Sequence, residues 1–124
     1  MKAKIFRSSF AVALVALLAA GILFLSVMYT NDSALAFEKL EAETAAFAPG
    51  TEDGGAAYLT RAAGADRITW VAADGTVLYE SAAAAERMEN HLSREEIAAA
   101  LQTGTGRSSR YSGTGLTETL YFAR

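Results

Sequence analysis

An uninterrupted apolar stretch near the N-terminus is the most prominent pattern in the chain. Residues 10–29 read FAVALVALLAAGILFLSVMY, without a charged residue or a proline. A helix of these twenty residues, rising about 1.5 Å per residue, is about 30 Å long, which matches the hydrocarbon core of a bilayer. Because a helix satisfies its own backbone hydrogen bonds, such a segment is stable in lipid. The pattern therefore predicts a transmembrane helix over residues 10–29.

The charges around this stretch predict its orientation. Lys2, Lys4 and Arg7 precede it, and no acidic residue does. Basic residues are retained on the cytoplasmic side, so residues 1–9 are expected in the cytoplasm and residues 30–124 outside the cell membrane.

A cleaved signal peptide is the alternative to a retained anchor, with a small-residue site at Ala34-Leu35-Ala36. The apolar part of a signal peptide usually has about 7 to 15 residues, fewer than this stretch has. The length therefore favours an anchor, and a secreted binding protein remains the alternative.

The next segment alternates apolar and acidic residues at mostly helical spacing. The apolar positions are Leu35, Phe37, Leu40 and Phe47. This spacing predicts a juxtamembrane helix over residues 30–48, ending before Pro49-Gly50. It would either pass a displacement into the membrane or simply cover a sheet. A polar loop over residues 51–55 and a short helix over residues 56–63 are expected to follow.

Two runs rich in β-forming residues then flank Asp74-Gly75. Residues 67–73 read RITWVAA and residues 76–79 read TVLY. An Asp-Gly pair between such runs predicts a hairpin with a type I′ turn, in which both central residues have positive φ. Because the first run is apolar on both faces, the strand is expected to be covered on both sides.

The best-specified helix outside the membrane is predicted over residues 94–103. Ser93 and Glu96 have the spacing of a capping box, and Gly104 is well placed to end the helix. Two further strands are expected over residues 106–112 and 119–123.

A turn over residues 113–116 is expected to join these two strands. The chain then stops at Arg124 inside an apolar run, which suggests truncation.

Composition limits the possible functions. With 124 residues the chain holds about one domain, and with no cysteine it has no disulfide, thiolate metal site or cysteine nucleophile. Beyond the apolar stretch, eight of the 11 basic residues remain with all 14 acids, a formal balance of −6. An acidic domain has no electrostatic footprint for nucleic acid, so DNA and RNA are excluded as partners.

Several strings in this order resemble the extracytoplasmic sensor region of phosphate-regulon-type bacterial membrane sensor histidine kinases. They are ITWVAADGTVLYES, MENHLSREEIAAALQTGTGRSSRYS and TLYFAR, and the resemblance covers about residues 45–124. It implies a PAS-like (Cache-like) domain: a five-stranded antiparallel sheet with helices on one face, lying between two membrane helices. It also implies a strand order of 2-1-5-4-3 and a homodimer.

The expected fold class is therefore α+β: an N-terminal transmembrane helix, then a PAS-like antiparallel sheet with flanking helices. Only four strands are found by pattern, so the domain over residues 49–124 is expected to be incomplete, with its fifth strand missing between the first and the fourth. The expected function is that of a signal-sensing input module of a two-component sensor histidine kinase. The alternative is a single-pass membrane-anchored interaction or structural protein with the same head and no kinase.

The residues offer no catalytic machinery, and no cofactor is expected. His91 is the only histidine, and the predicted topology places it outside the cell, away from ATP. It is a candidate pH-responsive or ligand-contacting group, or a loop anchor held by a hydrogen bond. A lone histidine with scattered acids lacks the spacing of a metal site.

Arg94, Arg107 and Arg110 are candidates for an anion-binding pocket, because arginine suits carboxylates and phosphates. The alternative is that these arginines are solvated and paired with Glu95 and Glu96. The bilayer is the expected partner, together with an extracytoplasmic ligand or protein of unknown identity.

Overall fold

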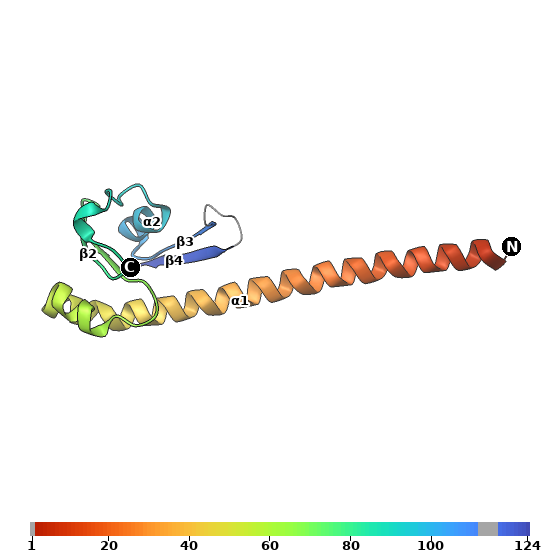
Figure 1. Ribbon diagram of the computed structural model, residues 1–124, viewed down its shortest axis with the longest axis horizontal. Helices are drawn as coiled ribbons and strands as arrows, with labels where there is room; N and C mark the ends of the chain where they lie inside the picture. Colours follow the sequence, from red (N-terminus) through yellow and green to blue (C-terminus); the bar gives the residue numbers. More distant parts are fainter. Residues whose placement is uncertain (1, 112–116) are drawn as a thin grey trace. The chain divides into compact units, whose positions relative to one another are not determined.

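The computed structural model describes residues 2–111 and 117–124. It has an α+β composition with small antiparallel sheets, which confirms the predicted fold class at that level (Figure 1). The elements in chain order are α1 (Lys2–Ala62), β1 (Thr69–Val71), β2 (Val77–Glu80), the 3₁₀ turn η1 (Ala85–Arg87), α2 (Glu95–Thr103), β3 (Gly106–Tyr111) and β4 (Glu118–Ala123). They form two compact units, residues 1–35 and residues 36–124, the second of which we call the head.

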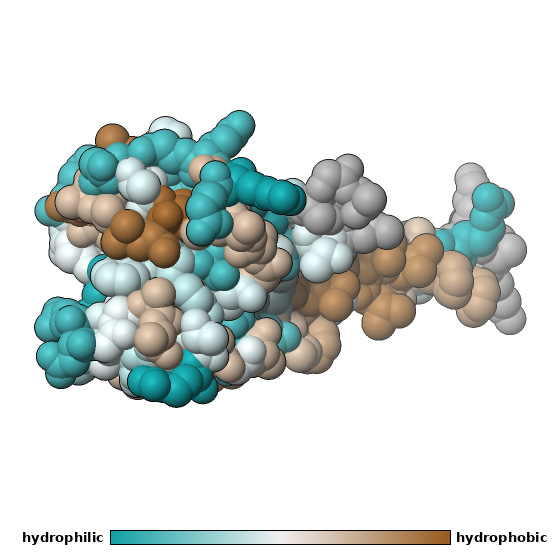
Figure 2. Space-filling model, turned by 60° about the vertical axis from the view of Figure 1, so that its left-hand side comes forward, coloured by the Kyte–Doolittle hydropathy of each residue, from teal (hydrophilic) through white to brown (hydrophobic). Residues whose placement is uncertain are grey.

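The described part of the first unit, residues 2–35, is helical, and its large apolar side chains are exposed. Every such side chain from Ile5 to Tyr29 is exposed, including Phe24 at 62% and Leu25 at 67%. They give this part of the surface its brown colour in Figure 2. Among the described residues, α1 is the one helix long and apolar enough to cross a membrane. The prediction of an apolar helix over residues 10–29 is therefore confirmed.

The predicted end of the helix before Pro49 is wrong. α1 continues through Pro49 as far as a kink at Gly55, where the backbone is non-helical, with φ of 55° and ψ of −146°. The predicted loop over residues 51–55 is therefore helical up to this kink, and the second helical segment, which ends at Ala62, confirms the predicted short helix over residues 56–63. Glycine reaches such positive φ values easily, whereas side-chain-bearing residues rarely do. A Cβ on Gly50 would meet the ring of Tyr58, so the end of α1 packs on this glycine. This packing overrides the local preference for a loop.

The predicted hairpin is confirmed, but its predicted turn type is wrong. β1 and β2 pair antiparallel, with Thr69 opposite Glu80. No described residue other than glycine has positive φ, so Asp74 does not adopt the type I′ conformation, whereas Gly75 has φ of 86°. The loop has three residues: Gly75 N–H donates to Ala72 O (2.9 Å), and Ala72 N–H donates to Thr76 O (2.8 Å). The Asp74 carboxylate accepts the Thr76 N–H (2.9 Å), which favours this geometry.

The helix and strands at the C-terminal end agree with the predicted ranges. β3 and β4 pair antiparallel from Gly106 opposite Ala123 to Tyr111 opposite Glu118. The predicted turn over residues 113–116 lies outside the described residues. α2 ends as predicted at Gly104, which has φ of 90° and whose N–H donates to Ala100 O (2.8 Å).

The predicted capping box at the start of α2 is wrong. The N-cap residue is Arg94, and no side chain caps the helix. Glu96, which is 4% exposed, instead accepts a hydrogen bond from Ser108 of β3 (2.5 Å). The Ser108 hydroxyl therefore takes the place of the Ser93 backbone N–H as the donor to Glu96.

The four strands form two separate sheets, β1-β2 and β3-β4. Among the described residues, each strand therefore has one hydrogen-bonded edge and one edge without a neighbouring strand. Few side chains among the described residues of the head are buried. Three of these are apolar (Leu59, Val77 and Ala123), and four are polar or charged (Glu80, His91, Glu96 and Ser108). The hydrogen bonds and ion pairs of these buried polar residues therefore contribute much of the stability of the head.

Candidate functional site

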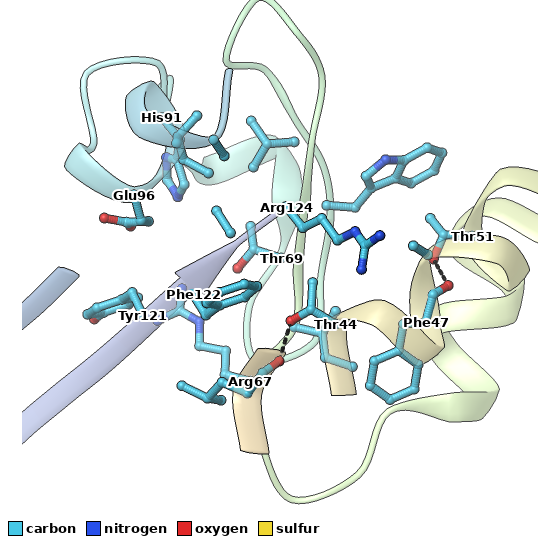
Figure 3. Close-up of a pocket in the computed structure, with 18 of the residues that line it drawn as sticks. Thr44, Phe47, Thr51, Arg67, Thr69, His91, Glu96, Tyr121, Phe122 and Arg124 are labelled. Carbon is cyan, nitrogen blue, oxygen red and sulfur yellow. Dashed lines mark hydrogen bonds between the residues drawn. The ribbon is translucent and has the colours of Figure 1, made fainter. Parts of the chain in front are cut away.

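A cleft of about 860 Å³ separates the two sheets (Figure 3). One wall is residues 68–73, which include β1, and the opposite wall is residues 119–124, which include most of β4. α1 and α2 contribute further side chains. Its large apolar lining residues include Leu40, Phe47, Leu59, Trp70, Ile97 and Phe122. A cleft of this volume lies within the range of ligand-binding sites, and its lining also includes charged side chains such as Asp66, Arg94 and Arg124.

His91 is a buried polar residue of the cleft, 5% exposed. Its N–H donates to Gly75 O (2.8 Å), and its O accepts from Arg94 N–H (3.0 Å). Its ring Nδ1 lies 2.7 Å from Glu89 O. Because a carbonyl only accepts, Nδ1 is the donor in this contact. These contacts support the loop-anchor interpretation. A pH-responsive or ligand-contacting role for His91 stays a prediction.

Glu96 ties α2 to β3. Its Oε2 accepts from Ser108 Oγ (2.5 Å), and its Oε1 accepts from Arg110 Nη2. Arg110 also lies over the Tyr121 ring, 3.9 Å from the centroid, and its buried Nε has no hydrogen-bond partner among the described residues. Burial raises the pKa of Glu96, but the hydrogen bonds from Ser108 and Arg110 lower it more, so the net pKa is below the ordinary value.

Glu80 holds the β1-β2 hairpin to the adjoining loops. Its side chain is fully buried. It accepts from Arg67 Nε and Nη2 (both 2.9 Å), Thr69 Oγ1 (2.8 Å) and Ala82 N–H (3.0 Å). Burial raises the pKa of Glu80, but these hydrogen bonds outweigh it and lower the net pKa. The two buried carboxylates, Glu80 and Glu96, therefore belong to separate networks, one at each sheet.

The three candidate arginines do not converge. Arg107 and Arg110 are three positions apart in β3, so their side chains leave opposite faces of the sheet. Arg107 Nη2 donates to Glu41 Oε2 (2.7 Å), and Arg107 Cζ lies 5.4 Å from the Phe37 ring centroid, whereas Arg110 binds Glu96. Arg94 lines the cleft. The period of two in a strand could have predicted this separation from the sequence.

The predicted pairing of the arginines with Glu95 and Glu96 is confirmed for Arg110 and Glu96 alone. Sequence reasoning missed Arg67, Glu80 and Glu41. Arg67 and Glu80 could have been predicted as a pair. Alignment of the predicted hairpin places Glu80, at the end of the second strand, near Arg67, at the start of the first.

Inorganic anions are expected to give no specific stabilisation, because Arg107 and Arg110 each already bind a carboxylate. We expect phosphate or sulfate to shift the thermal unfolding midpoint of the detergent-solubilised full chain no more than chloride of equal ionic strength. Arg107→Ala and Arg110→Ala should respond to the anions as the parent does. A phosphate-specific rise in midpoint that disappears in either variant would contradict this prediction.

Acid is expected to destabilise the head through Glu80 and Glu96. Their pKa values in the folded state lie below the ordinary 4.5. Their stabilising contribution is therefore complete above about pH 4.5 and is lost as the pH falls through the folded-state values. Denaturant midpoints from pH 7 to pH 3 should be flat at first and then fall. The double variant Glu80→Gln with Glu96→Gln should show a weaker fall, and an equal fall would remove these carboxylates as the cause.

Comparison with known proteins gives no match: no family model, no curated protein and no solved structure is similar to this chain. Within residues 2–111 and 117–124, no group of three or more histidine and acidic side chains is placed to hold a metal ion. Functional inference therefore depends on the geometry of the cleft and on the apolar helix.

Proposed function

We propose that this chain is a membrane-anchored input module of a two-component sensor histidine kinase, with a PAS-like head outside the cell membrane and its N-terminus in the cytoplasm. The apolar part of α1 would be the anchor. The head would bind a ligand or partner in the cleft and relay that event through α1. We assign no catalytic role to residues 1–124.

One observation carries the proposal: α1 contributes a stripe of side chains to the lining of the cleft. Leu40, Thr44, Phe47 and Thr51 recur at helical spacing along one side of α1, and all four line the cleft. Any occupant therefore contacts the helix that also contains the apolar segment. A ligand with different affinities for two arrangements of this helix would shift their populations.

The strand pairs support a PAS-like head. In the order 2-1-5-4-3 that the resemblance implies, β2 adjoins β1 and β4 adjoins β3, and these are the two pairs present. The cleft lies between β1 and β4, at the place that this order gives to the fifth strand. The observed pairs thus agree with four strands of such a sheet.

Site-specific thiol labelling tests the topology, because the chain contains no cysteine and each introduced one is unique. Ser33→Cys should react with a membrane-impermeant maleimide in intact spheroplasts. The matched variant Ser8→Cys should react only after lysis. Release of the protein by carbonate washing, or the opposite labelling pattern, would overturn the anchored topology.

Cysteine scanning over residues 30–44 tests the expected homodimer. Disulfide cross-linking in membranes should peak with the period of about 3.5 residues typical of paired helices. Uniformly absent cross-links would reject a dimer through this segment.

The alternative function, a single-pass interaction protein without a kinase, is favoured by two ion pairs that fix α1 within the head. Lys39 Nζ lies 2.6 Å from Asp66 Oδ2, and Arg107 Nη2 lies 2.7 Å from Glu41 Oε2. These contacts suit a static cover as well as a signalling helix. Cross-linking that does not change when the cleft is filled would support the static role.

A further inference from the structure

We infer that Met88 is a site of reversible oxidation, at which a peroxide converts the thioether to a sulfoxide whose oxygen then binds Arg67. This goes beyond the sensor assignment, because it names a chemical modification of the head and does not require a kinase. The chain has three methionines and no cysteine, and of these methionines Met88 alone lies in residues 36–124. An oxidant that reaches the head therefore meets a single sulfur atom.

Met88 directly follows the η1 turn, and its sulfur is in contact with a guanidinium group. The residue is half-buried, and its N–H donates to Ala85 O (3.0 Å), which fixes the backbone at this point. Arg67 Nη2 donates to Met88 Sδ at 4.0 Å. A thioether sulfur is only a weak acceptor. The donor is therefore already in place for a stronger acceptor at the same position.

The Arg67 guanidinium has the donor capacity for a further acceptor. Its Nε and Nη2 each donate to the fully buried Glu80 carboxylate at 2.9 Å, which fixes the plane of the guanidinium. Nη2 carries two N–H groups, so one can serve Glu80 while the other serves Met88. A sulfoxide oxygen on Met88 can therefore accept from Arg67 without displacing the buried carboxylate.

The oxidation needs no co-reactant other than the peroxide. A sulfur lone pair attacks one oxygen of hydrogen peroxide, the O–O bond breaks, an S–O bond forms, and water leaves after proton transfer. The sulfur is oxidised to the sulfoxide, and the peroxide is reduced to water. A hydrogen bond from a guanidinium to the sulfoxide oxygen is charge-assisted and therefore stronger than the contact with the thioether. Oxidation would thus tie the loop after β2 to the start of the β1-β2 hairpin.

The direction of the effect distinguishes this site from incidental damage. In a packed core, a sulfoxide is destabilising because it adds a polar atom that has no partner. Met88 is half-buried, and the side chain of its donor, Arg67, is 49% exposed, so neither group has to be fully desolvated. The new oxygen also has a charged partner. We therefore expect the oxidised head to be more stable than the reduced head.

Hydrogen peroxide treatment of the full chain in detergent micelles tests this inference. Peptide mapping by mass spectrometry locates the added oxygen, and denaturant unfolding measures the stability of the head. Met28, within the apolar stretch of residues 10–29, is the internal reference, because detergent covers this stretch. Met88→Leu is the matched control, since it keeps the apolar volume and removes the sulfur. Met88→Gln supplies a permanent amide oxygen in place of the sulfoxide oxygen.

We expect Met88 to take up one oxygen atom before Met28 does. The unfolding equilibrium constant should then fall by roughly three- to tenfold, the gain of about one hydrogen bond. Met88→Leu should not change in stability with peroxide, and untreated Met88→Gln should resemble the oxidised parent. Arg67→Ala should take up oxygen at Met88 without becoming more stable. Methionine sulfoxide reductases should return the oxidised parent to its starting stability.

Three results would overturn the inference. The first is that Met88 stays unoxidised in the folded chain while free methionine in the same solution reacts. The second is that the oxidised parent is no more stable than the reduced parent. The third is an equal gain in Arg67→Ala, since the sulfoxide would then act through another partner. If Arg67→Ala fails to fold, hydrogen exchange at the Arg87 and Met88 amides, which donate to Ala84 O and Ala85 O, decides instead: oxidation should slow it, and unchanged exchange would contradict the tie to Arg67.

Discussion

Alanine at position 75 is expected to destabilise the head by about 3 kcal/mol, through backbone conformation and crowding together. Gly75 has φ of 86°, which costs a residue with a Cβ about 1 kcal/mol or more. A Cβ there would also lie 2.6 Å from the backbone nitrogen of Leu92, and such crowding costs about 1 to 3 kcal/mol. Both costs arise at the same residue, and the carbonyl oxygen of this residue also accepts the His91 N–H.

Substitutions at three other glycines separate the cost of backbone conformation from the cost of crowding. Gly104 has φ of 90° but open space around its Cβ position, so Gly104→Ala should cost about 1 kcal/mol. Gly106 lacks positive φ but meets the backbone of Glu96, so Gly106→Ala should cost about 2 kcal/mol. Gly64 has neither constraint, and Gly64→Ala should be close to neutral. Denaturant unfolding followed by Trp70 fluorescence measures all four, and a Gly75→Ala cost no larger than that of Gly104→Ala would contradict the crowding argument.

Removing the Glu80 carboxylate is expected to destabilise the head by about 3 kcal/mol, within the range for breaking a buried ion pair. Glu80→Ala takes away the acceptor for the Arg67 guanidinium, the Thr69 hydroxyl and the Ala82 N–H at once. Arg67→Ala should cost less than Glu80→Ala. The Arg67 side chain is 49% exposed, and the loss of Glu80 leaves Arg67 able to reach water, whereas Glu80 is fully buried.

A double-mutant cycle on Arg67 and Glu80 checks this assignment. The two single variants and the double variant should show a coupling free energy of about 1 kcal/mol or more, because the groups share two hydrogen bonds. Glu89→Ala, at an exposed acid on the following loop, serves as the control and should be close to neutral. Additive costs for Arg67→Ala and Glu80→Ala would show that the buried carboxylate is stabilised by its other partners alone.

Features set by local sequence could be predicted well. The uncharged run over residues 10–29, the hairpin around Asp74-Gly75 and the stop of α2 at Gly104 each depend on residues close together in the chain. Features set by distant contacts could not. α1 continues past Pro49 because Tyr58 packs on Gly50, and the capping box at Ser93 is absent because Ser108 and Arg110 bind Glu96.

The residues of the candidate site show the same difference between what local sequence predicts and what distant contacts decide. Arg94 and His91 were named from the sequence, and both line the cleft. Arg107 and Arg110 were expected to converge, although a strand period of two separates them. Glu80 carried no signal of burial by itself, because an acid at the end of a short strand is usually solvated. Alignment of the predicted hairpin places Arg67 near it, but the Ala82 N–H that also binds the carboxylate is brought there only by the folded loop.

The small apolar interior of the head has a consequence for the lifetime of the protein in the cell. Leu59, Val77 and Ala123 are the buried apolar residues among those described, a modest hydrophobic contribution for a unit of this size. An occupant that binds only the folded form lowers the population of open molecules that proteases degrade. Turnover of the protein should therefore slow when the cleft is occupied, and the amount of protein should rise and fall with the occupant.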